Sequence, residues 1–270
     1  MIEAPILLFG GALALVFGLA IGSFLNVVIW RVPVGTSIVS PPSACTSCGT
    51  PIAPRDNVPV VSWILLRGRC RHCDSPISAR YPLVEAVTGV AFVLVTVGAL
   101  VEVYPASFSL PLAYFVAISI ALALIDLDTH TLPNKLVLPS YPVLAGLLVI
   151  ASAIEAEWLR MVTAGLGTVI LFGFYFLLAM ISPRGMGFGD VKLAGVIGML
   201  LGWLGWGPLA VGGFAAFLLG GVFSILLIAT RRVSRKGGIP FGPWMIAGAY
   251  VGISVGNPLI EWYLSSMGIR

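Results

Sequence analysis

Two aspartates lie at the edges of long apolar segments in a chain that contains few acids. Asp126 opens the stretch Asp126-Leu-Asp-Thr-His-Thr-Leu-Pro-Asn134, and Asp190 closes the stretch Gly187-Phe-Gly-Asp190. A charged side chain costs about 2.5–3.5 kcal/mol at the centre of a membrane helix and less toward the interface. An acid retained in such a place is therefore a candidate functional group, and two of them suggest acid–base chemistry beside a membrane.

Hydrolysis of a peptide bond by two carboxylates needs one ionised group to activate water and one protonated group. Two close carboxylates meet this need because like charges cannot both ionise. Asp126 and Asp128 would point to different faces of a helix, so Asp190 is the better partner for either. His130 follows Asp126 by four residues, but Pro133 argues against a helix that continues so far. We expect His130 to be an interfacial residue.

Glycines surround Asp190, at positions 185, 187, 189, 195 and 198. They are typical of a flexible loop followed by tight helix packing, and they could also let a substrate backbone approach the carboxylate. The following helix directs its positive end at Asp190, which favours the ionised form. Lys192 is expected to be a juxtamembrane anchor, and the alternative is that it tunes Asp190 or touches substrate.

Small and polar residues also lie in the first and last apolar segments. Gly22, Ser23 and Asn26 belong to the first, where helix packing is the first interpretation and the lining of a polar cleft is the second. Phe241-Gly-Pro243 opens the last segment, where a proline near a helix start is ordinary structure.

All four cysteines lie in one long loop, as two C-x-x-C pairs formed by Cys45 and Cys48 and by Cys70 and Cys73. Both pairs belong to an internal repeat, C-x-x-C-x-x-P-I-x-x-R, which recurs after 25 residues. Four thiolates can complete a tetrahedral zinc shell, and the 21-residue gap between the pairs is one longer than usual. Gly49 and Asp74 follow the pairs and tolerate the left-handed backbone that a zinc knuckle often needs.

The alternative interpretation of the cysteines is two disulfides, which a reducing cytoplasm would disfavour. His72 is a further possible ligand, but four cysteines already fill the shell and we expect a surface position for it. A shell of four cysteines has no open coordination position, so the zinc is expected to be structural and to supply folding free energy to the loop.

The composition places the chain in a membrane. It has 270 residues, of which 59% are hydrophobic and 10% charged, whereas soluble domains carry about 25% charged residues. The N-terminus lacks the basic region of a signal peptide, so a retained first helix is expected. Segments of about 20 residues can span a bilayer, and they fall near 6–30, 83–103, 108–126, 136–154, 160–182, 206–230 and 241–263. A shorter segment near 191–204 is marginal, with Trp203 and Trp206 expected at the outer interface.

The basic residues are distributed unevenly between the loops. Thirteen of the 15 lie in the alternate loops 31–82, 127–135, 183–192 and 231–240. The positive-inside rule makes these loops cytoplasmic and puts both termini outside. A re-entrant 191–204 segment would break this pattern, so the sequence predicts an all-α, polytopic integral membrane protein with about eight transmembrane helices. Asp126 and Asp190 then share the cytoplasmic side.

In their joint order these motifs resemble the bacterial type IV prepilin peptidases, which are G-x-G-D intramembrane aspartyl proteases. The resemblance covers most of the chain, and its residues are Gly22-Ser-Phe-Leu-Asn-Val-Val-Ile-Trp-Arg-Val-Pro33, the paired C-x-x-C loop, Arg80-Tyr-Pro-Leu-Val-Glu85, Asp126 with Leu132-Pro-Asn134, Gly187-Phe-Gly-Asp-Val-Lys192 and Ile239-Pro-Phe-Gly-Pro243.

The resemblance implies that Asp126 and Asp190 are the catalytic pair, since the family's first aspartate stands eight residues before the Asn of its L-P-N motif. It implies removal of the basic leader of prepilins or pseudopilins, after a glycine and at the cytoplasmic face of the bacterial inner membrane. It also implies methylation of the new N-terminal amine with S-adenosylmethionine. The chain has no strand-embedded G-x-G-x-x-G unit, so no residues are assigned to that cofactor.

The predicted organisation has three parts: a first transmembrane helix over 1–30, a cytoplasmic four-cysteine zinc-binding loop over 31–82, and a seven-helix membrane peptidase core over 83–270. The expected partners are prepilin or pseudopilin substrates and the lipid bilayer, with no nucleic acid. One rival is a proton-coupled transporter with a structural zinc loop, although the two acids lie at segment edges. A weaker rival is a zinc-ribbon membrane scaffold without catalysis.

Overall fold

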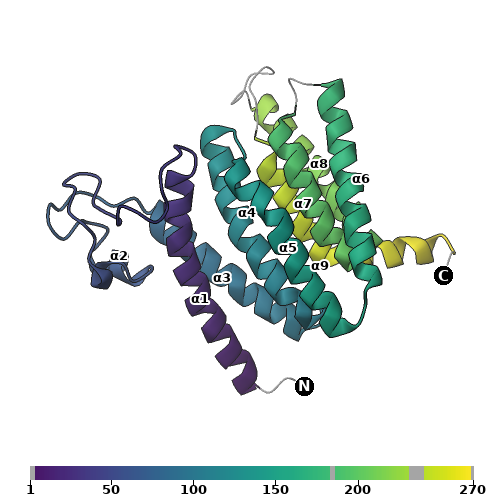
Figure 1. The fold of residues 1–270 in the computed structure, drawn as a ribbon, viewed down its shortest axis with the longest axis horizontal. Coiled ribbons are helices and arrows are strands. Elements are labelled where there is room, and N and C mark those ends of the chain that lie inside the picture. Colours follow the sequence, from purple (N-terminus) through teal and green to yellow (C-terminus); the bar gives the residue numbers. More distant parts are fainter. Residues whose placement is uncertain (1–3, 183–185, 231–239, 269–270) are drawn as a thin grey trace. The chain divides into compact units, whose positions relative to one another are not determined.

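The computed structural model describes residues 4–182, 186–230 and 240–268, and their regular structure is helical apart from two isolated β-bridges. The all-α prediction is therefore confirmed. Each of the eight predicted apolar segments forms one long helix (Figure 1): α1 (Ala4–Arg31), α3 (Arg80–Leu100), α4 (Ser109–Thr129), α5 (Asn134–Glu155), α6 (Leu159–Ile181), α7 (Phe188–Leu204), α8 (Trp206–Ala229) and α9 (Gly242–Ser266). Three short helices accompany them: η1 (Pro54–Asp56), α2 (Val61–Leu65) and η2 (Ala106–Phe108).

Six helical segments of the described chain are long and apolar enough to cross a membrane: those of α1, α3, η2 with α4, α5, α6 and α8. Helix α7 has only 17 residues, so it is about 26 Å long, against roughly 30 Å for a hydrocarbon core. The count of eight spans therefore stays a prediction. The residues at 184, 231, 232, 235 and 236, which contribute to the predicted orientation, lie outside the described part, as do Gly185 and both chain ends.

The chain forms two compact units, and the first comprises residues 1–101 and 115–121. In it, α1 and α3 pack so closely that a Cβ added at Gly18 would lie 2.8 Å from Gly89 Cα, and one at Gly22 would lie 2.7 Å from Glu85 Cα. The side-chain amide of Asn26 donates a hydrogen bond to the Tyr81 carbonyl at 3.1 Å. These contacts support the packing interpretation of Gly22 and Asn26, because small residues let helix backbones approach.

The second unit comprises residues 102–114 and 122–270, and α7 packs against α5, α6, α8 and α9 within it. Most of α7 between Val191 and Trp203 is buried. Its contact with α6 is close at Gly202, where an added Cβ would lie 2.5 Å from the Thr163 carbonyl oxygen. The apolar residues of the short segment 191–204 therefore contact other helices. Inside a membrane such contacts are stabilised by van der Waals packing of small residues, because the hydrophobic effect does not drive helices together there.

Trp203 departs from the expected interfacial position. Its side chain is 1% exposed, its Nε1 donates to Ser152 Oγ at 2.8 Å, and its ring stacks on Phe108 with a centroid distance of 5.2 Å. A buried indole needs a partner for its N–H, and Ser152 supplies it. The prediction for Trp203 is therefore wrong, whereas Trp206 is exposed, as an interfacial residue would be.

Candidate functional site

Asp126 lies in the last turn of α4 and is buried, with 4% of the residue exposed. Its Oδ2 accepts a hydrogen bond of 3.0 Å from the backbone N–H of Gly242, the first residue of α9. A Cβ added at Gly242 would lie 2.7 Å from the same oxygen. A helix N-terminus offers unpaired N–H groups to an anion, so the start of α9 is well suited to hold this carboxylate. Gly242 is a site residue that the sequence interpretation missed, because Phe241-Gly-Pro243 looks like an ordinary helix start.

Asp190 lies in the first turn of α7, and it caps its own helix. The Gly187 N–H donates to Asp190 Oδ2 at 3.2 Å, and the Asp190 N–H donates to the Gly187 carbonyl at 3.1 Å. The bond from the Gly187 N–H to the Asp190 carboxylate is one half of a capping box, and the Gly187 carbonyl takes the place of the side chain that glycine lacks. Capping alone would therefore account for an acid at this position. A functional role depends on what lies near this carboxylate.

The structure brings Asp126 and Asp190 together around Leu132, the Leu of the L-P-N motif. A Cβ added at Gly189 would lie 3.0 Å from Leu132 Cβ, and one at Gly242 would lie 3.4 Å from Leu132 Cδ2. The Leu132 side chain thus packs against the neighbour of Asp190 and against the residue that binds Asp126. The two carboxylates also interact electrostatically. Helices α4, α7 and α9 therefore bring their ends to one site.

The residues near Asp126 in sequence are arranged as expected. Asp126 is buried whereas Asp128 is exposed, which confirms that the two point to different faces of α4. The helix ends at Thr129, and His130 is an exposed residue with a left-handed backbone, φ 51°. His130 therefore does not continue the helical face that carries Asp126.

The glycines around Asp190 serve different purposes. Gly189 contacts Leu132, Gly195 lies against the Tyr141 hydroxyl, and Gly198 lies against the Gly167 carbonyl, so these three positions support the packing interpretation. Gly187 is exposed, and the atom nearest to an added Cβ there is Asp190 Oδ2 at 3.4 Å. Gly187 is thus the described glycine at which a missing side chain leaves room beside the carboxylate.

Lys192, which was expected to be a juxtamembrane anchor, also links α7 to α5. Its Nζ donates to Asn134 Oδ1 at 2.8 Å and lies 4.8 Å from the centroid of the Phe188 ring. Its carbonyl accepts a bond of 2.7 Å from the Tyr141 hydroxyl. Lys192 therefore ties the Asn of the L-P-N motif to the helix that carries Asp190.

An aromatic cluster lies next to Asp190 and was not expected from the sequence. Tyr175 of α6 is buried and interacts electrostatically with Asp190. Its ring centroid lies 5.2 Å from that of Phe217 and 6.2 Å from that of Phe241, which directly precedes Gly242. Aromatic residues at such distances are favourable packing partners, so the cluster fixes the start of α9 relative to α6 and α8. No spacing in the sequence predicts these contacts.

The cysteine loop contains two turns of the same construction. The Cys45 N–H donates to the Thr50 carbonyl and the Gly49 N–H to the Cys45 carbonyl, at 3.0 and 2.9 Å. The second turn repeats both bonds 25 residues later, from Cys70 to Ser75 and from Asp74 to Cys70, at 2.9 and 3.0 Å. Gly49 and Asp74 both have a left-handed backbone, with φ of 71° and 55°, as the sequence predicted. The internal repeat is therefore a structural repeat of two knuckles.

The four thiols converge on one point. The Sγ atoms of Cys45, Cys48, Cys70 and Cys73 all lie within 4.8 Å of one another, and those of Cys45 and Cys73 are 3.8 Å apart. Four sulfurs that bind zinc at 2.3 Å in a tetrahedron are about 3.8 Å apart. The four residues are free thiols. Hydrogen bonds from the Cys48 N–H and the Ser75 hydroxyl lower the pKa of Cys45 to about 5, which favours the thiolate that a metal needs. The cluster therefore fits zinc.

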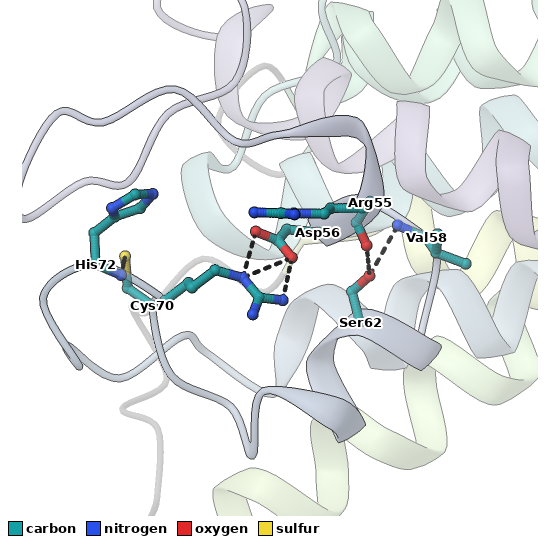
Figure 2. Close-up of polar contacts among 7 residues, drawn as sticks. Arg55, Asp56, Val58, Ser62, Cys70 and His72 are labelled. Carbon is teal, nitrogen blue, oxygen red and sulfur yellow. Dashed lines mark hydrogen bonds and ion pairs between the residues drawn. The ribbon is translucent and has the colours of Figure 1, made fainter.

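Side-chain contacts around the knuckles hold the loop together (Figure 2). The Arg71 guanidinium forms a bidentate pair with Asp56, with Nε 3.0 and 2.9 Å from the two carboxylate oxygens, and it lowers the pKa of that carboxyl below its usual range. Ser62 donates to the Arg55 carbonyl at 3.1 Å and accepts from the Val58 N–H at 3.0 Å. These bonds connect the second knuckle, η1 and α2. The cluster of candidate metal ligands consists of the four cysteines and does not include His72.

Comparison with known proteins shows which proteins this chain is similar to. Residues 16–99 match the model of the Bacterial Peptidase A24 N-terminal domain, and residues 113–225 match that of the Type IV leader peptidase family. A prepilin leader peptidase/N-methyltransferase of Aeromonas hydrophila is 32% identical over 94% of this chain and 94% of its own. Proteins of the same name from Pseudomonas putida and Bacillus subtilis are 34% and 30% identical, over 94% and 92% of this chain and 93% and 96% of theirs. No solved structure matches the chain.

Proposed function

This chain belongs to the prepilin leader peptidase/N-methyltransferase family, and we propose that Asp126 and Asp190 are its catalytic aspartates. The proposed reaction is removal of the basic leader peptide from type IV prepilins or pseudopilins, at the cytoplasmic face of the bacterial inner membrane. The observation that carries this proposal is the packing of Leu132 against both Gly189, the neighbour of Asp190, and Gly242, whose N–H binds Asp126. Two close carboxylates can share one proton and act as acid and base.

The proposed mechanism uses both carboxylates in turn. The ionised one takes a proton from water as the water oxygen attacks the scissile carbonyl, and the protonated one gives its proton to the leaving amine. The N–H of Gly242 holds Oδ2 of Asp126, and the N–H of Gly187 holds Oδ2 of Asp190. We therefore assign the proton transfers to the Oδ1 atoms. We also propose that the substrate backbone approaches Asp190 from the side of Gly187, which has no side chain.

The family name supports a second activity, methylation of the new N-terminal amine with S-adenosylmethionine as the methyl donor. The open cavity of about 460 Å³ beside the second knuckle is lined by Leu66, Arg67, Arg69, Cys70, Arg71 and Asp74. These side chains offer no aromatic face on which an adenine ring could stack, and cofactor pockets are lined mainly by apolar and aromatic groups. The cavity does not fit this cofactor, and we assign no residues to it.

We propose that the metal at the cysteine cluster is zinc and that its role is structural. Four thiolates complete a tetrahedral shell and leave no position for a substrate or a reactive water. Cys45, Cys48, Cys70 and Cys73 would hold the two knuckles together, and the binding free energy would contribute to the folding of a loop that has little apolar core.

The test of the peptidase is cleavage of a purified prepilin by the full-length protein and by three asparagine variants. Asp126→Asn and Asp190→Asn should each lower cleavage by at least about 10³-fold, because a missing acid–base group costs roughly 10²–10⁴-fold and the two groups act as a pair. Asp128→Asn removes an exposed acid two residues from Asp126 and should cleave normally. Mass spectrometry of the product, with and without S-adenosylmethionine, reports the cleavage position and the methylation.

Full cleavage by Asp126→Asn or Asp190→Asn would refute the assignment. Loss of cleavage in Asp128→Asn would show that Asp128 also takes part, contrary to the choice of Asp126. The transporter alternative is less well supported, because Asp126 lies in the last turn of α4 and Asp190 in the first turn of α7. Acids that relay protons across a membrane are expected near the middle of the spans as well, whereas both of these acids lie at helix ends. An unchanged pilus in an Asp126→Asn strain would favour the scaffold alternative.

A further inference from the structure

Helix α2 of the cysteine loop exposes an apolar face. Val61, Ile64 and Leu65 are 50%, 60% and 76% exposed, and their i, i+3, i+4 spacing places them on one side of the helix. The opposite side is anchored: Ser62 is buried, and Trp63 Nε1 donates to the Ile77 carbonyl at 3.0 Å. These contacts prevent α2 from turning about its own axis, so Val61, Ile64 and Leu65 stay exposed on the surface of the loop.

Helix α2 also lies beside the beginning of a membrane span. The N–H of Val60, directly before α2, donates to Glu85 Oε2 at 2.7 Å, and Glu85 is the sixth residue of the span Arg80–Leu100. Five residues of helix advance about 7.5 Å along the axis. The polar headgroup region on each side of the hydrocarbon core is about 5–8 Å thick. With Arg80 at the outer edge of the headgroups, Glu85 lies near the boundary with the acyl chains, and its bond to Val60 keeps α2 at the same depth.

The charges between α2 and the second knuckle are positive, and the next acid along the chain is Asp74 within that knuckle. Arg67 and Arg69 are exposed, and no acid occurs between residues 57 and 70. The nearby Asp56 is paired with Arg71, so it does not neutralise them. Both arginines line the open cavity of about 460 Å³ beside the second knuckle, together with Arg71 and Asp74, so arginines outnumber acids there. An apolar helical face flanked by arginines is the pattern of a segment that lies in a membrane interface, where the aliphatic groups enter the acyl boundary and the guanidinium groups reach phosphates.

We propose that residues 58–69 are a membrane-docking element that binds the anionic phospholipid surface and holds the cysteine loop against the bilayer. Val61, Ile64 and Leu65 enter the acyl boundary, and Arg67 and Arg69 bind lipid phosphates. The element adds a lipid-binding surface to a loop whose other proposed role is zinc binding.

The test places a photoreactive diazirine amino acid at position 65 of the full-length, zinc-loaded protein in vesicles. One set of vesicles is phosphatidylcholine alone, and the other contains phosphatidylglycerol as well. Mass spectrometry should show phospholipid adducts at position 65, several-fold more than at Ser47, an exposed control position in the first knuckle. Each arginine near an anionic surface strengthens binding roughly fivefold, so adducts should increase with phosphatidylglycerol. The double variant Arg67→Gln, Arg69→Gln should lose that increase.

Zinc content is measured for every variant, because loss of zinc reveals a misfolded loop. If the double variant has lost its zinc, the single Arg67→Gln and Arg69→Gln variants are used in its place. Adducts between position 65 and the same chain, or between two copies, would show that protein covers the apolar face and would overturn the proposal. Lipid adducts no more frequent than at Ser47 would also overturn it. Equal adducts in the two vesicle types would refute an anionic partner.

Discussion

At the scale of single residues, Gly242 shows how a backbone position can matter as much as a carboxylate. Its N–H binds Asp126 Oδ2 at 3.0 Å, and its missing side chain lets α9 begin next to that oxygen. The sequence makes Asp126 conspicuous, because an acid beside an apolar segment is costly. Nothing in Phe241-Gly-Pro243 reveals that residue 242 meets residue 126. The local surroundings of Asp190 likewise do not reveal a functional role, since its bonds to Gly187 look like an ordinary helix cap.

Gly242→Ala should reduce prepilin cleavage without unfolding the protein. The new Cβ would lie 2.7 Å from Asp126 Oδ2, which is too close, so the carboxylate or the start of α9 must move. Displacement of a catalytic group by about 1 Å can cost roughly 10²-fold, and we expect a loss of kcat of that order. The measurement is steady-state cleavage kinetics together with the thermal unfolding temperature.

The matched control for Gly242→Ala is Gly221→Ala in α8, because a Cβ at Gly221 would have no atom within 4 Å. Alanine is the better helix former, so this control should keep full activity and equal or higher stability. Normal kinetics in Gly242→Ala would show that the contact with Asp126 is not needed for catalysis.

At the scale of elements, the cysteine loop is the part in which sequence and structure correspond most directly. Its repeat of C-x-x-C-x-x-P-I-x-x-R becomes two turns with the same backbone hydrogen bonds. Bonds within such a turn depend only on neighbouring residues, so a local sequence pattern is enough to predict them. The convergence of the two turns into one cluster depends on contacts further apart, such as the 3.8 Å approach of Cys45 Sγ to Cys73 Sγ.

The double variant Cys45→Ser, Cys73→Ser should lose its zinc. Purified, reduced wild-type protein should contain about one zinc per chain, because four thiolates form one tetrahedral site. The variant takes one ligand from each knuckle, and the remaining two thiolates cannot hold the metal in a closed shell. Metal analysis by mass spectrometry gives the stoichiometry.

His72→Ala is the control for the cysteine variant, since its imidazole stands outside the four sulfurs that cluster. It should keep the full zinc content. A wild-type protein without zinc, or a double serine variant that retains it, would contradict the proposed site.

At the scale of the whole molecule, the helices that carry the two aspartates differ in how well they fit a membrane. Helix α4 belongs to a segment that is long and apolar enough to span, whereas α7 has 17 residues and packs against four other helices. The sequence alone assigns α7 a marginal span. In the structure the apolar residues of α7 are buried against other helices of the second unit. Their hydrophobicity is explained by these contacts, so it does not show whether α7 crosses the bilayer.

Reporter fusions after successive loops should decide the topology. Loop charges predict that a fusion after Thr131 is cytoplasmic and one after Glu157 is outside, and a fusion after Gly205 is outside only if α7 spans. Green fluorescent protein should therefore fluoresce after Thr131, and alkaline phosphatase should be active after Glu157 and Gly205. Fluorescence after Gly205 would show that α7 does not cross and that eight spans is too many. Phosphatase activity after Thr131 would reverse the orientation.

The sequence by itself determined the class of this protein, the positions of its long helices, the repeated knuckles and the two aspartates. These follow from composition and from residues close together along the chain, where apolar length, cysteine spacing and misplaced charge each have a direct physical cost. Only the tertiary structure decided that Leu132 joins Gly189 to Gly242, that Lys192 binds Asn134, and that Trp203 is buried on Phe108. Those contacts bring together residues from distant helices, and packing between helices depends on shape complementarity that no local pattern contains.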